Sequence, residues 1–118
     1  MLYTETWVRQ DIQQLVNTTF LDGGLYCNDD ESNLLGVEMY DGTRPTGLNG
    51  ACTAYAILGD DTSVTANGGV DGHKAWVILP SEFLTVEGSI QIALKVGTTT
   101  VGLFKGYVYR TATDDVVE

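Results

Sequence analysis

Hydrophobic and polar residues alternate most regularly in the segment Ser89–Val96. Because successive side chains of a β-strand point to opposite faces, this alternation predicts a strand with one face in a core and the other in water. The core-facing positions are Ile90, Ile92, Leu94 and Val96. Gly97 then marks a turn, and Thr99–Arg110 is expected to pair with the first strand as a hairpin.

Four further strands are expected upstream, each ending near a turn residue. They are Leu35–Met39, Ala51–Leu58, Val64–Ala66 and Lys74–Leu79. The 14 glycines of the chain concentrate where these apolar segments end, which is typical of turns between strands.

A single helical turn is expected at Ser81–Leu84, where Phe83 or Leu84 would plug one end of the fold. Strands spaced by about 8–12 residues, with no long helix between them, favour an antiparallel sandwich over a parallel α/β sheet. We therefore expect an all-β fold, a small antiparallel β-sandwich of immunoglobulin-like or jelly-roll-like type.

The first 33 residues show a different pattern. Asp11 is expected to cap a short helix whose apolar residues recur at i, i+3 and i+4. These residues are Ile12, Leu15 and Val16. We therefore divide the chain into an N-terminal arm with a short helix and an acidic loop, residues 1–33, and a β-sandwich domain, residues 34–118.

Composition agrees with one acidic globular domain. The chain has 118 residues, of which 43% are hydrophobic. Six Lys and Arg against 16 Asp and Glu give a net charge of −10. Such a field repels phosphate backbones and anionic lipid headgroups, so neither nucleic acid nor a membrane is an expected partner.

Candidate catalytic residues are few, because His73 is the single histidine. A hydrolase would use it as the general base or pair it with Cys27, since such partners meet in space rather than in sequence. Its place beside Gly72 favours a solvated histidine in a turn. We expect no enzymatic activity, and a small hydrolase is the weakest alternative.

Metal and cofactor sites are likewise not expected. Zinc sites use about four Cys or His ligands, whereas the chain has two cysteines and one histidine. The acidic segments Asn28–Glu31 and Asp60-Asp61 lack the spacing of a calcium loop and are expected to be solvated. Cys27 and Cys52 are expected to be buried thiols rather than a disulfide, because no secretion signal follows Met1.

Large apolar side chains in the N-terminal arm are candidates for a protein contact. A small sandwich has little room to bury them, and an apolar arm left in water favours association. The expected assembly interface consists of Tyr3, Trp7, Ile12, Leu15 and Val16.

Carbohydrate binding is the alternative function, because aromatic side chains also stack on sugars. The candidate sugar platform would use Tyr40, Tyr55, Trp76 or Tyr107. Core packing is the first expectation for Trp76, because its strand is apolar on both faces.

Two segments carry a resemblance to tailed-bacteriophage structural proteins. Gly69–Pro80 contains an Asp-Gly turn and a strand that ends in Leu-Pro, and Thr85–Lys95 contains a Val-x-Gly stop followed by a strand. With a last strand at Gly106–Asp114, this order resembles the N-terminal domain of the baseplate upper protein family and of related head-fibre proteins. The resemblance covers roughly Asn33 to Val117.

The resemblance implies a non-enzymatic β-sandwich that holds fibres or decorations on the virion and needs no cofactor. Expected partners are the major capsid or baseplate subunits, and a homo-oligomer is expected, with a trimer preferred. The implied location is the virion, after assembly in the host cytoplasm. In longer relatives a fibre region follows this domain, whereas this sequence ends at Glu118, which favours a capsid decoration, an anchor or an adaptor.

Overall fold

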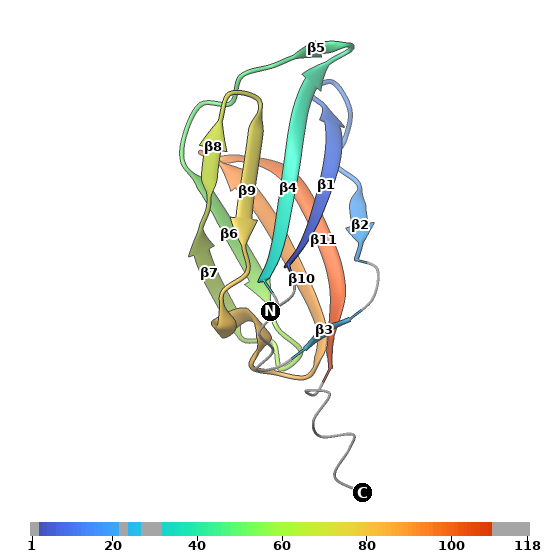
Figure 1. Cartoon of the computed structure of the whole chain (residues 1–118), viewed down its shortest axis with the longest axis vertical. Helices are drawn as coiled ribbons and strands as arrows, with labels where there is room; N and C mark the ends of the chain where they lie inside the picture. The colour runs from blue at the N-terminus through green and yellow to red at the C-terminus, as the bar shows by residue number, and fades with distance from the viewer. Residues whose placement is uncertain (1–2, 22–23, 27–31, 110–118) are drawn as a thin grey trace, which may run out of the picture.

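The computed structural model describes residues 3–21, 24–26 and 32–109. Within these ranges eleven β-strands form two sheets that face each other across one core (Figure 1). In chain order the elements are β1 (Tyr3–Asp11), β2 (Thr18–Phe20), β3 (Leu25–Tyr26), β4 (Ser32–Asp41), β5 (Arg44–Pro45), β6 (Cys52–Ile57), β7 (Ser63–Asn67), β8 (Gly69–Asp71), β9 (Lys74–Ile78), the 3-10 turn η1 (Ser81–Leu84), β10 (Gly88–Val96) and β11 (Thr99–Tyr109).

Sheet A has the strand order β1-β4-β9-β8, with β5 paired to the end of β4. Sheet B has the order β2-β11-β10-β6-β7, with β3 paired to the end of β11. The strands from β4 onward pair antiparallel, whereas β1 runs parallel to β4 and both β2 and β3 run parallel to β11. Both sheets are therefore mixed.

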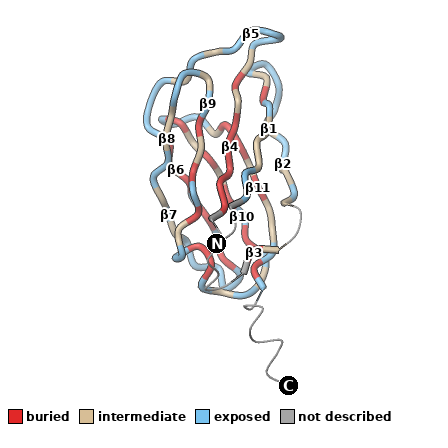
Figure 2. The backbone as a smooth tube through the Cα atoms, viewed as in Figure 1, coloured by how far each residue is buried: buried red, intermediate tan, exposed pale blue. Residues whose placement is uncertain are grey.

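The core lies between the sheets and follows the alternation seen in the sequence. In β10 the four predicted positions are all buried: Ile90, Ile92, Leu94 and Val96. They face buried residues of β4, among them Val37, across a core that runs the length of both sheets (Figure 2). The all-β prediction, including the six strands expected from residue 35 onward, is confirmed.

The η1 turn closes one end of the sandwich. Phe83 and Leu84 are both buried there, as their pattern predicted, and Pro80 precedes the turn in an extended conformation. Within the described residues, no helix has the length and apolarity needed to span a bilayer.

The predicted N-terminal helix is wrong. Asp11 ends β1, and the segment that follows it, residues 12–17, is a turn and irregular chain that we call the β1–β2 loop. The reason is that β1 pairs with β4 along its whole length, which places Val8 against the core. The Asp11 carboxylate accepts hydrogen bonds from the amides of Gln13 and Gly42, and thus orders two turns rather than a helix.

The expectation of an antiparallel sandwich is also wrong, because β1 pairs in parallel with β4, and β2 and β3 pair in parallel with β11. These three strands belong to the first 33 residues and contribute to both sheets. The boundary drawn between residues 33 and 34 falls inside β4.

Truncating the plug at η1 is expected to destabilise the fold. Phe83→Ala removes a fully buried ring and should lower the free energy of unfolding by about 3–5 kcal/mol. Urea denaturation of this variant, with the exposed neighbour Glu82→Ala as the control, measures the effect. Equal stability of the two variants would contradict the assignment of Phe83 to the core.

Candidate binding surfaces

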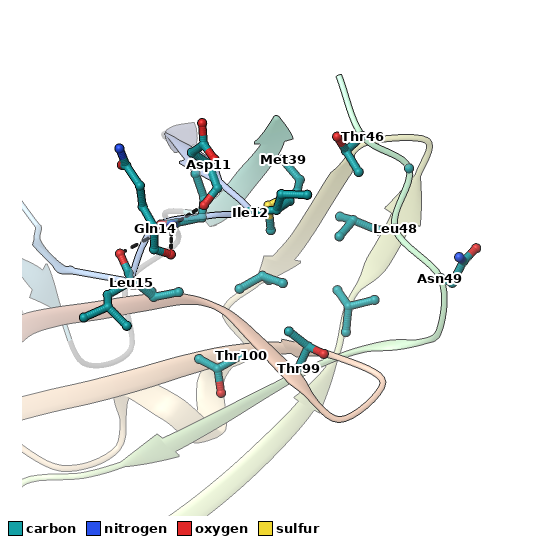
Figure 3. A pocket seen from close by; sticks show the side chains of 15 residues that line it. Asp11, Ile12, Gln14, Leu15, Met39, Thr46, Leu48, Asn49, Thr99 and Thr100 are labelled. Carbon is teal, nitrogen blue, oxygen red and sulfur yellow. Dashed lines mark hydrogen bonds between the residues drawn. The ribbon is translucent and has the colours of Figure 1, made fainter. Parts of the chain in front are cut away.

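A hollow of about 390 Å³ opens at the end of the sandwich opposite η1. The β1–β2 loop forms one wall and the segment 46–49 another, with Met39 of β4 between them (Figure 3). Val96 and Val101 of the β10–β11 hairpin complete the floor. The rim is apolar, because Ile12 is 49% exposed and Leu15 is 89% exposed.

The β1–β2 loop is held in shape by a buried amide. Gln10 is buried, and its Nε2 donates to the carbonyl oxygens of Asp11 at 3.0 Å and Gln14 at 3.1 Å, with a longer contact of 3.4 Å to Leu15. The Ile12 amide also donates to the carbonyl of Tyr40. The exposed Ile12 and Leu15 are therefore presented by an ordered loop.

Two tryptophans lie in one row across the outer face of sheet A, in register with two glycines. In order across β1, β4, β9 and β8 this tryptophan row reads Trp7, Gly36, Trp76 and Gly69. A methyl group at Gly36 would collide with the six-membered ring of Trp7, and one at Gly69 would collide with the indole of Trp76. Each indole thus lies flat against the glycine of the next strand.

A second row, one step along the strands, alternates in charge. This charged row reads Arg9, Glu38, Lys74 and Asp71. Lys74 Nζ lies 5.7 Å from the centroid of the Trp7 ring. The formal charges of this row sum to zero, and Glu5 adds a further carboxylate to the same face, where its Oε1 accepts a hydrogen bond from Trp7 Nε1 at 2.7 Å.

His73 and Tyr40 border the charged row. His73 Nε2 lies 3.6 Å from Glu38 Oε1, and its ring packs edge-on against Tyr40. On Tyr40 the guanidinium of Arg9 stacks at 3.7 Å from the ring centroid. His73 is thus a turn residue in contact with neighbours.

The outer face of sheet B is aromatic and free of carboxylates on its described strands. Outward residues of β2, β6, β7, β10 and β11 include Lys95 and Lys105 but no Asp or Glu. We call this surface the acid-free face. Its exposed large apolar side chains are Phe20, Tyr55, Ile57, Tyr107 and Tyr109.

The structure separates the residues of the predicted assembly interface. Ile12, Leu15 and Val16 come together at the hollow, whereas Trp7 lies on the outer face of sheet A. Tyr3 begins β1, but its side chain lies outside the described part of the structure.

The four candidate sugar-binding aromatics are also divided between faces. Tyr40 and Trp76 lie on sheet A, and Tyr55 and Tyr107 lie on sheet B. Trp76 is half-buried on the surface rather than inside the core. The position of Trp7 and Trp76 in one row was missed, because it depends on the register between strands distant in sequence.

The remaining candidate site residues that the structure describes have structural roles. Asp60 accepts a hydrogen bond from the Thr62 amide, and the Thr62 side chain and amide lower the pKa of its carboxyl, as in a turn. Cys52 is a buried free thiol next to the Trp76 carbonyl, while Cys27 and Asn28–Glu31 lie outside the described residues. Among the described residues, no group of three or more His, Cys, Asp or Glu could hold a metal ion.

Comparison with known proteins identifies a shared fold. No protein-family model and no curated protein matches the chain. Among solved structures, the chain is similar to the N-terminal domain of phage TP901-1 ORF48, with a TM-score of 0.52 and 10% sequence identity. The match covers 88% of this chain and 97% of that chain. At this identity, the likeness shows that the two-sheet architecture of this chain also occurs in a phage domain.

The role of Gln10 can be tested by removing its amide. Gln10→Ala leaves the carbonyls of Asp11 and Gln14 without their buried donor and should lower the free energy of unfolding by about 1–3 kcal/mol. Hydrogen exchange of the Gln14 amide, which donates to Asp11, should become faster. Gln14→Ala, at an exposed position, is the control, and identical behaviour of both variants would contradict the role of Gln10.

Burial raises the pKa of the Cys52 thiol above its ordinary value of 9.0. Because the folded pKa is raised, the stability contributed by the neutral thiol is fully present below pH 9.0 and is lost as pH rises through the folded pKa. A Cys27→Ser chain leaves Cys52 as the one cysteine, so that thiolate absorbance reports on it alone. We expect half-ionisation above pH 9.0 in the folded chain, and a midpoint at or below 9.0 would refute the burial effect.

Proposed function

We propose that this chain is a structural protein of a bacteriophage virion that acts by binding other proteins and not by catalysis. The observation that carries the proposal is the fold shared with a phage N-terminal domain over almost the full length of both chains. The resemblance of the Gly69–Pro80 and Thr85–Lys95 segments to phage structural proteins supports the same conclusion.

The acid-free face of sheet B supports a protein contact. A chain with a net charge of −10 repels other acidic proteins over most of its surface. On this face the Lys95 ammonium lies 5.2 Å from the centre of the Tyr55 ring, and Lys105 is in register with Phe20 of β2. Exposed aromatics dominate binding energy in protein interfaces. The partner that fits is a virion subunit that presents carboxylates to the two lysines.

The β1–β2 loop supports a second contact, through Ile12, Leu15 and Val16 at the hollow. Burying such a side chain against a partner contributes about 1.5–3 kcal/mol, and Leu15 is almost fully exposed in the isolated chain. Two contacts on different sides suit a module that joins subunits. We therefore assign it to capsid decoration or to anchoring a fibre or baseplate component, as a homo-oligomer with a trimer preferred.

The test uses two isoleucines that are exposed to a similar extent on opposite faces of the sandwich. Ile57 on sheet B is 49% exposed and Ile78 on sheet A is 52% exposed. In the phage that encodes this chain, Ile57→Glu should reduce the copies per purified particle roughly tenfold, because it places a carboxylate in an apolar contact. Leu15→Glu should have a similar effect, and Ile78→Glu should leave the copy number unchanged. Quantitative mass spectrometry normalised to the major capsid protein provides the measurement.

Absence of the unaltered chain from purified particles would overturn the proposed function. Equal loss for Ile57→Glu and Ile78→Glu would reject the acid-free face as the specific contact.

A further inference from the structure

Sheet A carries a surface that the proposed protein contacts do not use. Trp7 and Trp76 belong to the tryptophan row, and one side of each ring lies against a glycine of the next strand. Aromatic rings stabilise neighbouring glycines in sheets, and this accounts for the inner sides of the two indoles. Both side chains are partly exposed, and the Lys74 ammonium lies 5.7 Å from the centre of the Trp7 ring. The exposed part of each ring can contact a ligand with flat, apolar faces.

The two indoles are arranged as a repeat. Trp7 leans over Gly36 of β4, and Trp76 leans over Gly69 of β8, so each ring covers the next strand in the same direction across the sheet. Because β1 and β9 are two strands apart, the rings recur at about 10 Å. A ligand that touches both must present apolar faces with this repeat.

The charged row next to the tryptophan row indicates which polar groups a ligand should carry. Arg9 and Lys74 carry donors, and Glu38 and Asp71 carry acceptors, in strict alternation across the four strands. One Arg9 nitrogen, Nη2, already donates to the Gly42 carbonyl oxygen, so the remaining donors of this guanidinium would serve a ligand. A hydroxyl group both donates and accepts hydrogen bonds, so a row of hydroxyls matches this alternation. An anionic polymer would meet these carboxylates and the net charge of −10. This repulsion argues against an anionic ligand, and the alternation of donors and acceptors favours an uncharged, hydroxyl-rich one.

We propose that the tryptophan row and the charged row bind an extended, uncharged β-1,4-linked oligosaccharide. Its pyranose rings carry flat C–H faces that pack on indoles. Alternate rings of an extended β-1,4 chain turn the same face toward the protein, at about the spacing of the two indoles. Hydroxyl groups at the edge of the rings then reach the charged row, where Lys74 already lies near Trp7.

Tryptophan fluorescence is a direct probe of this surface. The chain contains two tryptophans, and both belong to the row, so emission reports on this face alone. We would titrate the full chain with cellohexaose and with chitohexaose, using maltohexaose as the control because its α-1,4 linkage coils the chain. Isothermal calorimetry provides a second readout.

We expect a saturable change in emission and a binding heat with at least one β-1,4 hexasaccharide, and neither with maltohexaose. Trp7→Ala and Trp76→Ala should each weaken binding by roughly tenfold or more. Gly36→Ala retains both tryptophans but lifts the Trp7 ring from the sheet, and should weaken binding as well. Tyr55→Ala, on the acid-free face, should leave affinity unchanged. Urea denaturation shows that each variant is folded.

No binding of either β-1,4 hexasaccharide would overturn the proposal, as would equal binding of maltohexaose or full affinity in the Trp7→Ala, Trp76→Ala double variant. Particle incorporation of the double variant separates this inference from the proposed function, since it should equal that of the unaltered chain. Loss of incorporation would show that a virion protein, and not a glycan, covers the tryptophan row.

Discussion

The parallel pairing of β1 with β4 is the constraint on which the features of this protein depend. It places Val8 in the core, Gln10 under the β1–β2 loop and Trp7 over Gly36, three positions that follow from one register. A shift by one residue would exchange the faces of β1, so that Trp7 would point into the core and Gln10 into water. The pairing therefore determines both the loop and the outer face of sheet A.

The two outer faces differ in a way that follows from their charges. The acid-free face carries exposed aromatic side chains and two lysines in a chain of net charge −10, and this combination favours a partner that supplies carboxylates. On sheet A the charged row is balanced and the aromatic rings lie flat, which favours an uncharged ligand. This difference in charge is the reason why we propose a protein partner for one face and an uncharged ligand for the other.

Much of this fold could be predicted where the information is local. The alternation in Ser89–Val96 is strong because one face of β10 is buried and the other is solvated. The short turn that buries Phe83 directly follows Pro80, which has an extended conformation and ends the preceding segment. The N-terminal segment was misread because Ile12, Leu15 and Val16 have helical spacing although their loop is shaped by Gln10 and β4. The tryptophan row was not predictable, since it joins strands whose register only the folded chain defines.

The most direct test of this account is an NMR measurement on the full chain. If β1 pairs with β4 as described, the ring of Trp7 shifts the Gly36 α-protons strongly upfield and shows nuclear Overhauser effects to them, because the indole lies against this glycine. Residues 11–16 then lack the sequential amide contacts of a helix. Gly36 α-protons at ordinary shifts, together with helical contacts in residues 11–16, would contradict the pairing and the arrangement of both surfaces that rests on it.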